Sequence, residues 1–143
     1  MPSKLIDAVA ELKFQYENVN PSSVDGLMNC YACDAVFKDP FQEVHGRPEI
    51  KHIFLNMYQQ LNQPTFLIRE TLIGDHQVAF LWDFHFSMKR WNKNPLKFTG
   101  VSWLYFDDQF FVATHHDYWD PSAGIYEHLP LIGTMMRGLK SLA

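Results

Sequence analysis

Apolar residues recur at helical spacing over the first part of the chain. In three stretches they stand three and four positions apart, so that in each stretch they share one face of a helix. A break at Asn20-Pro21 separates the first two stretches, and Pro48 stands in the first turn of the third. The pattern predicts helices at residues 3–18, 24–35 and 47–61, with a short extended segment at 35–41.

From residue 65 the spacing of apolar residues changes to two, which is typical of β-strands. Short polar turns divide this region into segments at residues 65–73, 77–88, 96–106 and 109–119. Consecutive strands joined by short turns pair antiparallel. Helices followed by a run of hairpins predict an α+β fold, in which the helices pack on one face of a curved antiparallel sheet.

A last helical pattern covers residues 122–142, where apolar residues again recur at intervals of three and four. We expect this helix to extend one domain that spans residues 1–143 and has its core at residues 3–120. A folded chain of this length buries roughly 70% of the surface that its unfolded form exposes. The domain therefore needs no disulfide or metal ion to be stable.

Two acid–histidine pairs stand on the predicted strands. Asp83 and His85 share one face of the segment 77–88, and His115 and Asp117 share one face of the segment 109–119. If both pairs face one enclosed space, a carboxylate among apolar residues gains the raised pKa that suits a general acid or base. The alternative is that each pair is hydrogen-bonded and supports its own strand.

Asp39 allows two similar interpretations. It stands directly before Pro40 in the extended segment, where an aspartate often forms a turn. A carboxylate at the mouth of a pocket between helices and sheet can instead abstract a proton from a ligand. The sequence leaves both interpretations open.

Composition and charge exclude several classes of protein. The chain is 47% hydrophobic and 15% aromatic, which excludes a disordered protein. Its net charge of −4 excludes a surface built to neutralise phosphates, so we expect no nucleic-acid partner. The first twenty residues carry several charges, and the apolar runs are far shorter than the roughly 20 residues that cross a bilayer. We therefore predict a cytoplasmic protein without a membrane partner.

The two cysteines, Cys30 and Cys33, form a C-x-x-C pair within the predicted helix 24–35. A redox pair would stand where a strand meets a helix, and a zinc site would add His45 and His52. The spacing of these histidines exceeds that of a zinc finger. We therefore predict structural thiols, with no metal and no cofactor, and keep the redox or metal use as the alternative.

Three short motifs carry a resemblance to a known family. They are the D-P motif within residues 34–41, the G-R-P-E-I motif at 46–50 and the D-Y-W-D motif at 117–120. With the order of elements over residues 3–120, they resemble the SnoaL-like branch of the nuclear transport factor 2-like superfamily. The superfamily also holds ketosteroid isomerase-like and limonene epoxide hydrolase-like members. The resemblance implies a cone-shaped α+β roll of the cystatin-like type, an apolar pocket and a homodimer joined through the sheet.

The resemblance also implies roles for particular residues. In ketosteroid isomerase-like members the aspartate of the D-P motif shuttles a proton, and Asp39 stands in that place. Tyr16 lies near the position of their oxyanion-binding tyrosine, whereas Ser102 replaces their protonated aspartate and is a weaker donor.

In epoxide hydrolase-like members two aspartates and an arginine activate water. Asp83 and Asp117 match the aspartates, but Leu81 stands in place of the arginine. In SnoaL-like cyclases an aspartate near the end of the sheet acts as acid and base, and Asp117 with His115 matches it.

These observations predict a pocket protein that isomerises, cyclises or hydrates a small apolar substrate without a cofactor. The expected catalytic residues are Asp117, His115, Asp83 and Asp39. The expected pocket-lining residues are Tyr16, Trp82, His85, Ser102 and Trp119. Two alternatives stay open: a non-catalytic carrier or sensor of an apolar ligand, and a dimeric interaction module that uses the helix at 122–142.

Overall fold

A curved sheet and three helices make up the part of the chain that the computed structural model describes, residues 4–90 and 94–120. The helices are α1 (Leu5–Glu17), α2 (Val24–Met28) and α3 (Arg47–Gln60). The strands are β1 (Tyr31–Lys38), β2 (Glu43–His45), β3 (Leu61–Ile73), β4 (Gln77–Met88), β5 (Leu96–Phe106) and β6 (Val112–Trp119). The helix predicted at 122–142 lies outside the described residues.

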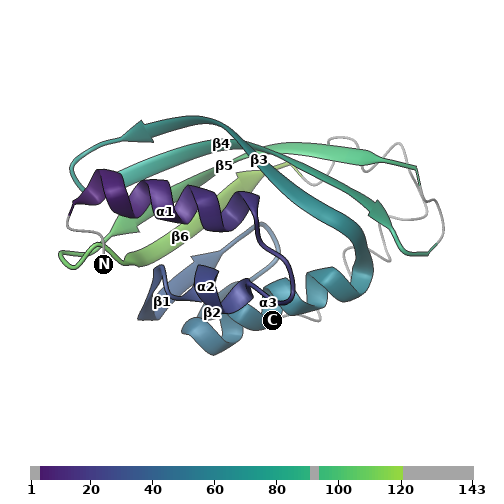
Figure 1. Ribbon diagram of the computed structural model, residues 1–143, viewed down its shortest axis with the longest axis horizontal. Coiled ribbons are helices and arrows are strands. Elements are labelled where there is room, and N and C mark those ends of the chain that lie inside the picture. Colours follow the sequence, from purple (N-terminus) through teal and green to yellow (C-terminus); the bar gives the residue numbers. More distant parts are fainter. Residues whose placement is uncertain (1–3, 91–93, 121–143) are drawn as a thin grey trace.

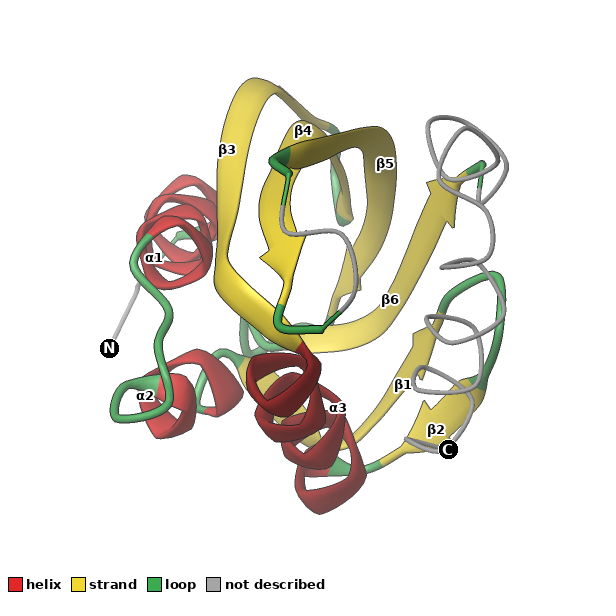
Figure 2. Ribbon diagram, turned by 90° about the vertical axis from the view of Figure 1, so that its right-hand side faces the viewer, coloured by secondary structure: helices red, strands yellow, loops and turns green. Residues whose placement is uncertain are grey.

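The six strands form one sheet in the order β2-β1-β6-β5-β4-β3. All neighbours pair antiparallel except β1 and β6, which run parallel. The sheet curls without closing (Figures 1 and 2). Helix α3 contacts β1 and β2 at one edge of the sheet and β3 at the opposite edge. The predicted α+β roll with helices on one side of a curved sheet is confirmed.

The core lies between the concave face of the sheet and the helices. Alternate residues of β4 point into it, and all of them are buried: Val78, Phe80, Trp82, Phe84, Phe86 and Met88. Leu12 of α1 and Ile50 of α3 pack against this face and are fully buried. Each such side chain stabilises the fold by about 1.5–3 kcal/mol relative to leaving it in water. The predicted bounds of β4 and β5 are also those of the structure.

The predicted second helix is wrong beyond Met28, because the chain enters β1 at Tyr31. Apolar residues at 24, 27 and 28 fit a helix, but Tyr31, Ala35 and Phe37 fit the alternation of a strand equally well. Pairing with β6 and β2 decides between the two. The cysteines therefore do not lie on a helix, and both are free thiols.

Two strand starts also differ from the prediction. Strand β3 begins at Leu61 because a bulge at Gln63, which has a φ of 46°, accommodates Pro64 and lets the ladder continue. Strand β6 begins at Val112 because the side chain of Asp107 accepts backbone N–H bonds from Gln109 and Phe111, which lengthens the turn.

No described helix is long and apolar enough to cross a membrane.

Candidate active site

A cavity of about 100 Å³ lies between the concave face of the sheet and helices α1 and α3. Most of its wall is aromatic or aliphatic. Its polar side chains come from the loop after β1 and from the neighbouring strands β5 and β6: Asp39, Ser102, His115 and Asp117. Among the described residues, no lysine or arginine lines the cavity. The wall therefore carries two carboxyl groups and no permanent positive charge.

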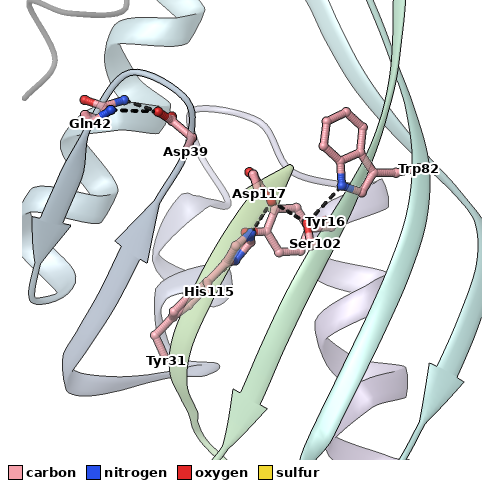
Figure 3. A network of polar contacts seen from close by, with 8 residues as sticks. All are labelled: Tyr16, Tyr31, Asp39, Gln42, Trp82, Ser102, His115 and Asp117. Carbon is pink, nitrogen blue, oxygen red and sulfur yellow. Dashed lines mark hydrogen bonds and ion pairs between the residues drawn. The ribbon is translucent and has the colours of Figure 1, made fainter. Parts of the chain in front are cut away.

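Asp117 binds its neighbours through one of its two carboxylate oxygens. Its Oδ1 accepts a hydrogen bond from His115 Nε2 at 2.6 Å and another from the hydroxyl of Ser102 (Figure 3). The hydroxyl of Ser102 in turn accepts a bond from the indole N–H of Trp82 at 2.9 Å. No described residue bonds to Oδ2 of Asp117. One oxygen is thus fixed by the protein, and the other is free on the wall of an apolar cavity.

The other ring nitrogen of His115 faces two tyrosines. Its Nδ1 lies 2.7 Å from the hydroxyl of Tyr31 and 3.3 Å from the hydroxyl of Tyr16, and the two hydroxyls are hydrogen-bonded to each other. Because Asp117 can only accept, an uncharged His115 carries its proton on Nε2. Its Nδ1 must then accept a hydrogen bond from the hydroxyl of Tyr31. This network is buried, and each of these groups has a partner.

Strand register brings these residues together. Ser102 of β5 pairs with Asp117 of β6, and Leu104 of β5 pairs with His115 of β6. Alternation along β6 therefore points both His115 and Asp117 into the cavity. Gly100 stands between Trp82 and Trp119 in the ladder. A Cβ at Gly100 would lie 2.5 Å from the Trp82 ring. Only glycine therefore lets this indole lie flat enough to reach Ser102.

Asp39 lines the same cavity, but both of its oxygens are occupied. Oδ1 accepts the backbone N–H of Phe41 at 2.8 Å and that of Gln42 at 3.1 Å. Oδ2 accepts the side-chain amide of Gln42 at 3.1 Å, and Figure 3 shows the contact between Asp39 and Gln42. Burial raises the pKa of Asp39, although these hydrogen bonds oppose the shift. Asp39 therefore forms a turn and also borders the cavity.

Asp83 and His85 lie outside the cavity, contrary to the expectation that they face Asp117. The alternation that turns Trp82 inward turns both of them to the convex face of the sheet. Asp83 accepts a bond from the hydroxyl of Thr99 at 2.7 Å and lies 3.5 Å from Arg69, and these contacts lower its pKa. His85 is exposed.

The other predicted lining residues do border the cavity: Tyr16, Trp82, Ser102 and Trp119. Sequence reasoning missed Tyr31, because it was assigned to a helix. Its contact with His115 can be inferred only when Tyr31 is placed at the start of a strand beside β6. In the described part of the chain, no group of three or more histidine, cysteine, aspartate or glutamate side chains is placed to hold a metal ion.

Residues 14–114 match the family model described as a SnoaL-like domain. The chain belongs to this family. The resemblance predicted from the sequence motifs is therefore confirmed. No curated protein matches the sequence.

Solved structures share the fold of this SnoaL-like chain at low identity. A putative SnoaL-like polyketide cyclase from Shewanella putrefaciens is 17% identical, with a TM-score of 0.72 and coverage of 92% of this chain and 98% of that chain. An NTF2-like protein from Burkholderia thailandensis is 11% identical, with a TM-score of 0.75 and coverage of 88% and 97%. A hypothetical protein with a ketosteroid isomerase-like fold from Catenulispora acidiphila, in complex with trimethylamine, is 15% identical, with a TM-score of 0.72 and coverage of 83% and 89%.

The two buried tyrosines make the stability of this SnoaL-like fold sensitive to alkaline pH. Burial raises the pKa of Tyr16 and of Tyr31 well above the ordinary value of 10.0. Above pH 10 the unfolded chain loses protons that the folded chain keeps. Each tyrosine therefore lowers the free energy of unfolding by about 1.4 kcal/mol per pH unit in that range.

We expect the double variant Tyr16→Phe, Tyr31→Phe to lose this contribution, so that its stability falls less steeply above pH 10. Urea unfolding at a series of pH values from 8 to 11.5 measures the slope. Tyr118→Phe, at an exposed tyrosine, is the control and should keep the wild-type slope. Equal slopes in the wild type and the double variant would contradict the burial argument.

Proposed function

We propose that this SnoaL-like protein binds a small, largely apolar molecule in its cavity and uses Asp117 to move a proton on it. The reaction class is a cofactor-independent isomerisation, cyclisation or hydration. The observation that carries the proposal is the free oxygen of Asp117. The carboxylate of this cavity-lining residue is held in place through Oδ1, and its Oδ2 accepts no hydrogen bond from any described residue.

A carboxylate in this arrangement suits a general base. Its two donors, His115 and Ser102, stabilise negative charge on Oδ1 and fix the side chain, so that no reorganisation is needed when a ligand binds. The surrounding wall is mostly aromatic and aliphatic, and in such a setting the attraction between the carboxylate and a proton of the ligand is stronger than in water. The proton leaves the ligand for Oδ2 and returns from Oδ2 to another atom of the same ligand.

Asp39 supports the same chemistry from a different environment. Both carboxyl groups line one cavity, and the charge of Asp117 adds to the burial that raises the pKa of Asp39. We assign the proton transfer to Asp117, whose Oδ2 accepts no hydrogen bond from a described residue. Asp39, whose two oxygens both accept protein N–H bonds, adds a second carboxyl group to the cavity wall.

The cavity wall limits the charge and the size of the ligand. With two carboxyl groups and no lysine or arginine among its described lining residues, it disfavours anions and accepts an uncharged or positively charged molecule. Cavities of about 150 Å³ hold benzene, so a cavity of about 100 Å³ suits a molecule of similar or smaller size. The trimethylamine complex of the Catenulispora acidiphila protein is compatible with such a ligand.

Binding without chemistry is the second candidate. Aromatic rings attract organic cations through their faces, and Trp82 and Trp119 both line the cavity beside Asp117. In that case Asp117 pairs with an ammonium group of the ligand and transfers no proton. The protein is then a carrier or sensor of a small apolar amine.

Proton transfer can be tested without knowing the substrate. Purified protein is incubated in deuterium oxide with a panel of small cyclic ketones and aldehydes, and NMR records deuterium entering the carbon next to the carbonyl. We expect exchange by the wild type on at least one compound. Asp117→Asn should slow it by about 10²- to 10⁴-fold, because the amide cannot take the proton.

Asp108→Asn, at an exposed aspartate, is the matched control and should exchange at the wild-type rate. A thermal melt shows whether Asp117→Asn remains folded, since its amide oxygen can still accept both bonds. Undiminished exchange by the Asp117 variant would refute the assigned base. Thermal stabilisation of the wild type by small amines, with no exchange on any carbonyl compound, would favour the carrier.

The convex face of the sheet supports a homodimer. It exposes a row of large apolar side chains from three strands: Leu67, Trp103, Tyr105 and Tyr118. An apolar surface of this kind is seldom left open to water. We infer that two copies pack through this face, which leaves the cavity on the opposite face of the sheet accessible.

Replacing Trp103, which is 50% exposed, with glutamate puts a charge into this face. We expect Trp103→Glu to convert a wild-type dimer into a monomer in sedimentation velocity, because an unpaired buried charge is costly. Phe14→Glu changes an exposed ring on α1 and should leave the dimer intact. A monomeric wild type, or a dimeric Trp103 variant, would exclude this interface.

A further inference from the structure

We propose that Tyr31 is a positioning residue for the proton transfer: it holds the His115 ring in the orientation that directs Nε2–H to Asp117. The inference rests on the proposed function. Tyr31 does not line the cavity, so a bound molecule does not touch it. Any effect of Tyr31 on the reaction must therefore pass through its hydrogen-bond partners, His115 and Tyr16, and the test below separates the two.

The geometry of the two rings supports this role. Tyr31 stands at the start of β1 and is fully buried, behind His115 as seen from the cavity. Its ring stacks nearly parallel to the imidazole, with an interplanar angle of 10° and centroids 6.0 Å apart. Its hydroxyl lies 2.7 Å from Nδ1, which is closer than the hydroxyl of Tyr16 at 3.3 Å. Tyr31 is thus the main partner of that nitrogen.

The donors and acceptors fit only one orientation of the imidazole. Nε2 faces Oδ1 of Asp117, which accepts only, and Nδ1 faces a hydroxyl that can donate. A ring turned over would point carbon atoms at both partners and leave a buried carboxylate oxygen short of a donor. Leaving a buried polar group unsatisfied costs about 1–3 kcal/mol, so the network strongly favours the observed orientation.

The titratable groups around His115 come from several elements. They are Tyr16 of α1, Tyr31 of β1, and Asp117 of β6, with Asp39 on the same cavity. Burial raises the pKa of Tyr31, so its hydroxyl keeps its proton and remains a donor throughout the neutral range. Tyr16 donates a hydrogen bond to Tyr31 and also borders the cavity. Both Asp117 and Tyr16, at the two ends of this network, therefore line the cavity.

The test compares Tyr31→Phe with Tyr58→Phe. The buried hydroxyl of Tyr58 has no hydrogen-bond partner in the described part of the chain, so removing it controls for the loss of a tyrosine oxygen. In ¹⁵N-labelled protein, NMR follows the proton on His115 Nε2 and the nitrogen shift of Nδ1. The wild type and the Tyr58 variant should show one strongly deshielded Nε2 proton and a hydrogen-bonded Nδ1.

In Tyr31→Phe we expect that proton to be lost to exchange with water and Nδ1 to move to its unbonded shift. The deuterium-exchange rate at saturation should fall about tenfold, which matches the loss of one hydrogen bond of about 1.4 kcal/mol. The half-saturation concentration should be unchanged, because Tyr31 does not touch the ligand.

Retention of the Nε2 proton signal and of the exchange rate in Tyr31→Phe would overturn the inference. A rate loss with an unchanged His115 spectrum would overturn it too, since the effect would not pass through the imidazole. If the wild type exchanges none of the carbonyl compounds, the proposed function fails separately. The His115 spectrum then decides alone: loss of the Nε2 proton in Tyr31→Phe supports the positioning role, and its retention refutes it.

Discussion

The parallel pairing of β1 with β6 is the contact on which the candidate site depends. It is the one parallel pair in an otherwise antiparallel sheet. By placing β1 against the edge of β6, it buries Tyr31 next to His115 and brings Asp39 to the wall that Asp117 occupies. Without it, His115 would lose the nearer of its two tyrosine neighbours, and the cavity would keep only one of its two carboxyl groups.

This pairing matters because burying polar groups is costly unless each finds a partner. The structure meets that requirement from Trp82 through Ser102, Asp117 and His115 to the two tyrosines. Oδ2 of Asp117 is the exception among these groups, since no described residue bonds to it, and Asp117 lines the cavity. A buried network that satisfies its other polar atoms but leaves one carboxylate oxygen open has the arrangement of a binding or catalytic site.

The sequence predicted the parts of the fold that local pattern controls. Alternation set the bounds of β4 and β5 and paired His115 with Asp117, because a half-buried strand fixes its own faces. It misplaced Tyr31, whose neighbours fit a helix and a strand equally well until β6 is present. It also grouped Asp83 with Asp117, because the sequence does not show which residues of β4 lie on the same side of the sheet as Asp117 of β6. Both points depend on pairing between strands that are far apart in the sequence.

The central claim is that Asp117 offers one free oxygen to a molecule in the cavity. A crystal structure of the protein soaked with small amines and alcohols tests it most directly. We predict a bound molecule whose N–H or O–H lies within hydrogen-bond distance of Oδ2, while His115 and Ser102 remain on Oδ1. A molecule bound with its polar group away from Asp117, or an Oδ2 already bonded to a protein group, would contradict the account.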